Sequence, residues 1–430
     1  KDTIPFVPNP NSESYYKNEP IIDKEGKTYD YKWRPFQLGF ILLNIDAFVQ
    51  PESNDTTVDD VFKLGWPERN EIADMVWFPT GGGKTEAYLG IIAFTIAYRR
   101  FTKGTKGNGT IVLMRYTLRM LTLQQFQRAT LLICALETIR KDNFQIPYNQ
   151  RLGNERITIG MFVGGGLLPN KWASQGEDKG MVGVLRDISE QISKNKKIIT
   201  SLPFTYCPWC GGDLFVNENL TNISPNHTEH GNNYGIGDQL DIACNSKGCT
   251  FHSKRSSESN SLPLRLFDED IYKYPPTLIF GTVDKFASFA NKVSNKTEER
   301  NADSRRLVGK GYGGARLSER DVLPPELIIQ DELHLLLGPL GTSVGLFEKS
   351  IDKLCTYTNE NNQKIKPKIV TSTATTRNTD KQVFALFNRR TEIFPKQGIF
   401  CDDSFFAFYK RKKTNVDEYA SKRKYVGLLP

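Results

Sequence analysis

The fold of this chain is decided by a short glycine-rich stretch, Phe78-Pro79-Thr80-Gly81-Gly82-Gly83-Lys84-Thr85. An apolar run that ends at Phe78 precedes the glycines and predicts a buried strand, and residues 85–101 predict a helix. A glycine-rich turn between a strand and a helix lets successive backbone N–H groups point at one anion, and the helix N-terminus adds a favourable potential. We therefore expect this loop to bind phosphate groups.

The residue types in the loop fit ATP with Mg²⁺. We expect the nucleotide to be held by Thr80, Gly81, Gly82, Gly83, Lys84 and Thr85. In this pattern Lys84 reaches the β- and γ-phosphates, and the Thr85 hydroxyl ligates Mg²⁺. The alternative is a structural turn followed by a chance Lys-Thr pair. The strand before the loop, the helix after it and three glycines in register argue against that alternative.

Further apolar runs alternate with helical patterns along the chain. Buried strands are predicted at residues 110–114, 157–163, 277–280, 326–330 and 368–372. Continuous apolar strands that alternate with helices are typical of a parallel sheet covered by helices on both faces. The sequence therefore predicts the α/β class, with a P-loop NTPase fold.

An acidic motif, Asp331-Glu332-Leu333-His334, directly follows the predicted strand at 326–330. In a parallel sheet the end of this strand lies at the same edge as the glycine-rich loop, where ligands bind. We expect Asp331 to hold Mg²⁺ through water and Glu332 to orient or deprotonate the water that attacks the γ-phosphate. A lone Asp-Glu pair is usually a solvated helix start, but the buried strand and the upstream loop favour a catalytic set of Glu332, Asp331 and Lys84.

Together these motifs resemble the first RecA-like domain of superfamily 2 DExH-box helicases. The resemblance accounts for Phe78, which stands where the general pattern G-x-x-x-x-G-K-[ST] has glycine, because helicase-like ATPases commonly depart from the pattern there. Trp33-Arg34-Pro35-Phe36-Gln37 resembles the adenine-sensing Q motif, which implies that Arg34 and Gln37 lie at the nucleotide and that Gln37 reads the base. This segment lies unusually far upstream of the glycine-rich loop.

Further loops resemble the motifs by which these helicases hold nucleic acid and couple hydrolysis to movement. Backbone N–H groups and Thr hydroxyls hold phosphates without reading bases, as a translocating motor requires. The residues implied to contact nucleic acid are Thr117, Arg119, Gln124, Gly165 and Thr282, and Thr373 and Thr375 match the coupling motif S/T-A-T. Each loop alone fits a strand-end turn or an N-cap equally well, but their order along the chain favours the functional interpretation.

Two longer stretches, residues 114–128 and 274–286, resemble the helicase subunits of bacterial DISARM anti-phage systems. This resemblance covers most of residues 30–410. It implies an ATP-dependent helicase or translocase that acts on DNA, with RNA as the alternative. It also implies partner subunits in a defence complex.

Four of the seven cysteines form a pattern typical of a metal site. Cys207 and Cys210 are spaced C-x₂-C, and Cys244 and Cys249 are spaced C-x₄-C. Together they supply four thiolates for a tetrahedral, structural Zn²⁺, and the wide loop between them is tolerable because loop-closure cost grows slowly with length. His252 is an alternative ligand. Unrelated free thiols, or a redox pair at Cys207 and Cys210, are the alternatives to a zinc site.

Composition and length fit a soluble protein of more than one domain. The 430 residues allow two or three domains, no apolar run approaches the ~20 residues of a membrane span, and no signal peptide is visible. Cys134, Cys355 and Cys401 lie in apolar surroundings and predict buried thiols, as in a reducing, cytoplasmic compartment. The net charge of +8 is compatible with nucleic acid but does not establish it.

The patterning divides the chain into successive segments. We expect an N-terminal arm with the Q-motif-like region at 1–72, a RecA-like domain in two parts at 73–170 and 263–390, a zinc-binding insertion at 171–262, and a basic linker at 391–430. The chain does not begin with Met, and no motif of a second RecA-like domain occurs in it. We therefore expect a fragment that binds nucleotide but hydrolyses it poorly.

Two other functions stay open at this point. The loop could gate a protein interface as a regulatory ATP switch or scaffold, in which nothing translocates. The motor could instead drive a restriction-type nuclease that lies outside this sequence. An ATPase rate that does not respond to DNA or RNA would favour the regulatory switch.

Overall fold

The computed structural model describes most of the chain. The described residues are 21–22, 28–29, 33–49, 69–78, 83–117, 119–142, 152–173, 179–194, 201–204, 206–212, 214–216, 240–244, 246–252, 260–291, 303–311, 320–336, 338–359, 362–373, 379–396, 398–399 and 406.

One sheet of eight strands organises the fold, and every neighbouring pair in it is parallel. From edge to edge the order is β14 (Arg390–Phe394), β3 (Ile72–Trp77), β13 (Lys368–Thr373), β10 (Leu327–Gln330), β4 (Val112–Tyr116), β9 (Leu278–Thr282), β5 (Ile159–Phe162) and β8 (Leu264–Arg265). Because the strands are parallel, their carboxyl ends lie together at one side of the sheet, which we call the C-terminal edge.

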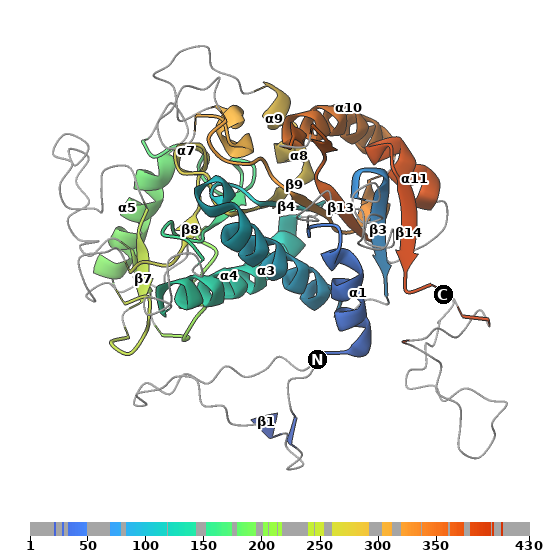
Figure 1. Ribbon diagram of the computed structural model, residues 1–430. Helices are drawn as coiled ribbons and strands as arrows, with labels where there is room; N and C mark the ends of the chain where they lie inside the picture. Colours follow the sequence, from blue (N-terminus) through green and yellow to red (C-terminus); the bar gives the residue numbers. More distant parts are fainter. Residues whose placement is uncertain are drawn as a thin grey trace, which may run out of the picture.

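Helices cover both faces of this sheet (Figure 1). Helices α3 (Lys84–Lys103) and α4 (Arg119–Asp142) pack on one face, and α10 (Gly338–Cys355) and α11 (Thr379–Phe387) pack on the other. Successive strand residues point to opposite faces. Val76 therefore packs in the core under α3, while Met75 packs in the core under α10. We call the two sides the α3 face and the α10 face.

The remaining described elements are five helices, three 3₁₀ turns and three two-stranded pairs. The helices are α1 (Pro35–Ile45), α5 (Gly180–Ser193), α7 (Asp268–Lys273), α8 (Val283–Phe286) and α9 (Ser288–Asn291), with 3₁₀ turns η2 (Gly104–Gly107), η7 (Ser304–Val308) and η9 (Leu333–Leu335). Two-stranded antiparallel pairs join β1 (Ile21–Ile22) to β2 (Thr28–Tyr29), β6 (Leu214–Val216) to β7 (Ile242–Cys244), and β11 (Tyr357–Thr358) to β12 (Lys364–Ile365). None of the described helices has the length and apolarity needed to cross a bilayer.

The predicted α/β class and the inner strands are confirmed, but β14 was not predicted from the sequence. This strand pairs with β3 in parallel, with Ile393 opposite Met75. It is only partly buried along its length and contains charged residues, because an edge strand needs less apolar cover than an inner one. The sheet therefore continues past residue 390, into the segment that the sequence analysis assigned to a linker.

Candidate functional site

The glycine-rich loop runs from β3 to the start of α3, where Gly83 is the N-cap residue. Gly83 has a φ of 93°, which residues with a side chain rarely adopt. A Cβ atom there would lie 2.7 Å from the side-chain nitrogen of Gln37. No side chain of the described residues caps the first turn of α3, so its N–H groups suit an anion. Lys84 and Thr85 begin the helix half-buried, and the predicted ligands Thr80, Gly81 and Gly82 lie outside the described residues.

The segment that resembles a Q motif lies against this loop in spite of its distance in sequence. The buried Gln37 side chain donates from Nε2 to the Gly83 carbonyl at 2.9 Å. Its Oε1 atom accepts a hydrogen bond of 2.8 Å from the Arg34 N–H, at the N-cap of α1. The rings of Phe36 and Phe78 stack with their centroids 3.8 Å apart. Gln37, predicted to read the base, thus uses both ends of its amide to join α1 to the loop.

Asp331 directly follows β10, and only 6% of the residue is exposed. Its Oδ1 atom accepts hydrogen bonds from the Glu332 N–H at 3.0 Å and from the Ser372 hydroxyl. Among the described residues, no basic side chain forms an ion pair with this carboxylate. A buried carboxylate without a cation is costly, and a hard cation such as Mg²⁺ supplies the missing charge. The surroundings of Asp331 therefore fit its predicted role at Mg²⁺.

A series of polar contacts joins the acidic motif to the glycine-rich loop along the C-terminal edge. The Glu332 carboxylate lies 3.3 Å from Nδ1 of His334, which in turn lies 3.5 Å from the Thr373 hydroxyl. The Thr373 carbonyl accepts a hydrogen bond of 3.4 Å from the Lys84 ammonium. Glu332 also has a φ of 50°, which is uncommon for a non-glycine residue and typical of functional sites. Three motifs far apart in sequence meet here; Thr375 lies outside the described residues.

The residues predicted to contact nucleic acid lie at the ends of three adjacent strands. Thr117 follows β4, Thr282 ends β9, and Gly165 follows β5. The hydroxyls of Thr117 and Thr282 are buried and have no hydrogen-bond partner in the described part of the chain. Gln124 is exposed on α4, and Arg119 is the first residue of that helix. These positions share one edge of the sheet.

The loop after β5 and the segment after β9 are held together by Asn170. The Lys285 ammonium donates to Asn170 Oδ1 at 2.9 Å and pairs with Asp268 at 2.7 Å. A Cβ atom at Gly165 would lie 2.8 Å from the Asn170 side-chain nitrogen. The two loops therefore form one unit, and Lys285 is bound within it.

The four cysteines of the predicted metal site converge in the structure. Their sulfur atoms all lie within 4.8 Å of one another, and all four residues are buried: Cys207, Cys210, Cys244 and Cys249. The N–H groups of Ser246 and Phe251 point at two of these sulfurs at 3.3 and 3.4 Å, and such donors stabilise thiolates. His252 lies outside the cluster, with Nδ1 2.9 Å from a main-chain carbonyl. The geometry is compatible with a structural zinc ion.

Two further cysteines differ from this cluster. Cys134 and Cys355 are buried free thiols, as predicted, and Cys401 lies outside the described residues. Burial raises the pKa of Cys134 above its ordinary value and that of Cys355 to about 12. Both thiols therefore stay protonated and serve as core residues.

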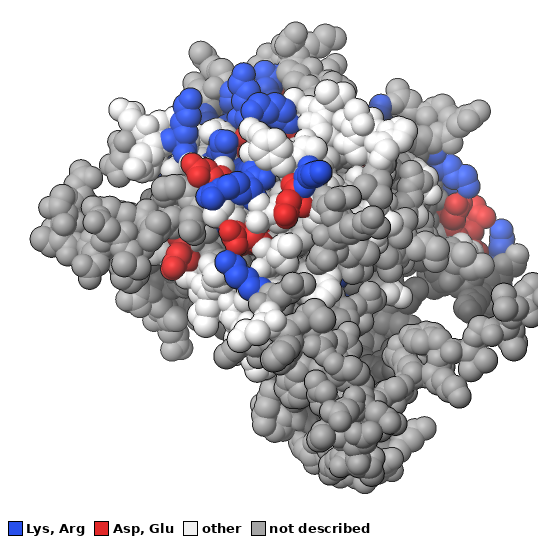
Figure 2. All heavy atoms as spheres, turned by 90° about the vertical axis from the view of Figure 1, so that its right-hand side faces the viewer, with Lys and Arg blue, Asp and Glu red and all other residues white. Residues whose placement is uncertain are grey.

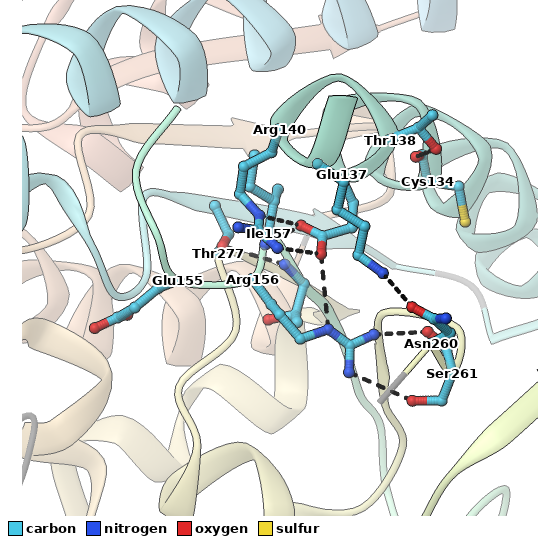
Figure 3. Close-up of polar contacts among 12 residues, drawn as sticks. Cys134, Glu137, Thr138, Arg140, Glu155, Arg156, Ile157, Asn260, Ser261 and Thr277 are labelled. Atoms are coloured by element: carbon cyan, nitrogen blue, oxygen red, sulfur yellow. Dashed lines mark hydrogen bonds and ion pairs between the residues drawn. The ribbon is translucent and has the colours of Figure 1, made fainter. Parts of the chain in front are cut away.

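The buried Glu137 carboxylate on α4 connects the sheet to the segment that carries the four clustered cysteines, which we call the cysteine module (Figure 3). Its oxygens accept two hydrogen bonds of 2.8 Å from Arg140 and one of 2.9 Å from the Ile157 N–H, just before β5. Arg156 lies 3.8 Å from the same carboxylate and donates to the Ser261 carbonyl at 2.6 Å. Because Ser261 follows the last cysteine pair in sequence, the return of the module to the sheet is anchored on α4.

The described part of the face shown in Figure 2 carries charges of both signs. Lys and Arg side chains gather at one end of this face, and elsewhere on it Asp and Glu side chains lie between further Lys and Arg side chains. Exposed ion pairs join Arg390 to Glu71 and Lys396 to Glu392. The described part of this face is therefore not uniformly basic, and its charges alone do not indicate a nucleic-acid site.

Comparison with known proteins adds an independent observation. No family model matches the chain. It is similar to the DISARM protein DrmA of Bacillus paralicheniformis, with 34% identity over an alignment of 427 residues that covers 95% of this chain. The predicted resemblance to a DISARM protein is confirmed. The chain spans about a third of the length of DrmA, since the match covers 34% of that relative.

The structure also adds functional candidates that the sequence analysis of this DrmA-like chain gave no role. Ser372 contacts Asp331, and His334 links Glu332 to Thr373. His334 stood within the quoted acidic motif, and Ser372 directly precedes Thr373 of the coupling motif, so their positions were the available signal. Glu137 had no such signal, because Arg156 and Ile157 lie in another segment and reach its carboxylate only in the folded chain.

Proposed function

We propose that this chain is the ATP-binding half of an ATP-dependent helicase or translocase that acts on DNA in an anti-phage defence system. The main support is the linked series of contacts from Glu332 through His334 and Thr373 to Lys84. It joins a phosphate-binding residue to a catalytic carboxylate at the edge where parallel sheets bind ligands. The similarity to the DISARM protein DrmA supports the defence context.

Each residue at this edge has a defined task in the proposal. Gly83 and the first N–H groups of α3 surround the phosphates, and Lys84 neutralises their charge. Thr85 and Asp331 hold Mg²⁺, which when bound draws charge from the phosphate oxygens. Glu332 orients the attacking water and accepts its proton. His334 holds the Glu332 carboxylate in place and contacts the Thr373 hydroxyl with the same ring nitrogen.

The strand-end loops have the second task in the proposal. Thr117, Gly165 and Thr282 hold the sugar–phosphate backbone, together with Arg119 and Gln124 from α4. Such contacts position nucleic acid without reading its sequence. Thr373, which touches both His334 and Lys84, lies where nucleotide state can be passed to neighbouring loops.

The cysteine cluster is proposed to bind zinc as a structural element. Four thiolates fill a tetrahedral shell and leave no position for a reacting water. The module is attached to α4 through Glu137, Arg156 and Ser261. It therefore supports the motor and performs no chemistry of its own.

An ATPase assay on the complete natural protein tests this proposal. The rate is measured alone and with single-stranded DNA, double-stranded DNA, and RNA of equal length. We expect DNA to raise the rate several-fold. A rate that ignores every nucleic acid would favour a regulatory ATP switch, and cleavage of the added DNA would favour the motor of a restriction-type complex.

A further inference from the structure

Two buried tyrosines face the acidic motif from the α3 face of the sheet. Tyr116 is the last residue of β4. Val112 and Met114 of the same strand pack under α3, and Tyr116 shares their face because alternate residues of a strand point the same way. Side-chain alternation along β10 and β13 places Asp331 and Ser372 on this same face, in phase with Ile329 and Val370. Tyr88, on α3 one turn after Lys84, completes the group from above the sheet.

The strand register brings these residues close together. Gln330 pairs with Arg115, and the Asp331 N–H donates to the Arg115 carbonyl at 3.1 Å, so Asp331 and Tyr116 are neighbours across the sheet. The Tyr116 ring is fixed by stacking on Phe280 at 4.9 Å. Tyr88 is held by the packing of α3 on the sheet and is fully buried. Neither phenol can turn away from this region into solvent.

Both phenol hydroxyls are buried, and neither has a hydrogen-bond partner among the described residues. A buried hydroxyl without a partner costs about 1–3 kcal/mol, so two of them at one spot need an explanation. A phenol ordinarily keeps its proton at neutral pH, so both hydroxyls are available as hydrogen-bond donors.

Asp331 is the matching acceptor. Its Oδ1 atom already accepts from the Glu332 N–H and the Ser372 hydroxyl, and the carboxylate faces no basic partner among the described residues. We propose that Tyr88 and Tyr116 are positioning residues that donate to the Asp331 carboxylate, or to a water bound on it, and set its orientation for Mg²⁺. Groups behind a metal ligand commonly change metal affinity by about 10–100-fold when they are removed.

This inference rests on the proposed ATP site, and it is tested in the complete protein by equilibrium binding of a fluorescent ATP analogue at increasing Mg²⁺. The variants are Tyr88→Phe and Tyr116→Phe, which keep the ring and remove the hydroxyl. The matched control is Tyr357→Phe. That hydroxyl is also buried and unpartnered in the described part of the chain, beside Glu326 at the opposite end of β10.

Mg²⁺ should increase nucleotide affinity in every variant. We expect each of the two variants to need about tenfold more Mg²⁺ than the unsubstituted protein to reach half of that increase. Affinity without Mg²⁺ and the melting temperature should stay close to those of the unsubstituted protein, and the control should not change. Unchanged Mg²⁺ dependence in both variants, or an equal change in the control, would overturn the inference alone. Failure of the unsubstituted protein to bind nucleotide would instead overturn the proposed function on which the inference rests.

Discussion

The side chain of Gln37 donates a hydrogen bond of 2.9 Å to the carbonyl of Gly83, a residue 46 positions further along the chain. This contact explains how a segment far upstream takes part in the site. Gly83 needs a positive φ to start α3, and the amide of Gln37 fills the space that a side chain at Gly83 would need. The contact fixes the end of the loop before any ligand arrives.

Replacement of Gln37 by Ala should loosen the glycine-rich loop. The change removes the donor to Gly83 and the acceptor for the Arg34 N–H, and each unsatisfied group costs about 1–3 kcal/mol. We expect weaker ATP binding and a lower melting temperature, measured by titration calorimetry and thermal unfolding. Gln124→Ala, at an exposed position on α4, is the control and should leave both unchanged in the absence of nucleic acid.

Replacement of Glu332 by Gln should separate binding from turnover. The amide keeps the shape of the side chain but cannot accept a proton, so hydrolysis should fall by about 10²–10⁴-fold. Nucleotide affinity should stay within a few-fold of the original, as measured by binding of an ATP analogue. Glu392→Gln, on the edge strand β14, is the control. Normal hydrolysis by the Glu332 variant would remove Glu332 from the catalytic set.

The cysteine cluster predicts one zinc ion per chain by elemental analysis. Cys210→Ser should release the metal and lower the melting temperature, because a hydroxyl is a poor ligand and zinc binding contributes to folding. A strong chelator should have the same effect on the unsubstituted protein. Cys134→Ala, which removes a buried thiol outside the cluster, should keep the zinc. Purified protein without zinc would contradict the assignment.

The link between the module and the sheet can be tested at Glu137. Glu137→Gln removes the charge that Arg140 and Arg156 face, and loss of one partner from a buried pair costs about 3–5 kcal/mol. We expect a clear loss of stability in chemical unfolding. Glu190→Gln breaks an exposed ion pair with Lys194 and should cost less than about 1 kcal/mol. Equal effects of the two substitutions would argue against the role of Glu137.

Much of the sheet was readable from the sequence because its inner strands are continuous apolar runs. The apolar run at 326–330 forms β10, and the acidic motif directly follows this strand. Because the sheet is parallel, the motif lies at its C-terminal edge. β14 was not predicted because its five residues include charged ones, as is common in an edge strand that pairs with a neighbour on one side only. An edge strand and a solvated linker can look alike in composition.

The site was readable only in part, because sequence order does not show which side chains share a face. The roles of Lys84, Asp331 and Glu332 follow from local patterns and remain proposals. The contact from Ser372 to Asp331 depends on the adjacency of β10 and β13, which no local pattern states. The same holds for Tyr88, because Asp331 and Ser372 are far from it in sequence and come close only in the folded sheet.

The central claim is that the glycine-rich loop binds ATP through Lys84, and equilibrium binding of Mg²⁺–ATP to the complete protein tests it most directly. Loss of one charged hydrogen bond is worth about 1.5–3 kcal/mol, so Lys84→Ala should weaken binding by about 10- to 100-fold. Lys103→Ala, at the far end of the same helix, should bind as the unsubstituted protein does. Equal affinity of the Lys84→Ala variant and the unsubstituted protein would contradict the account.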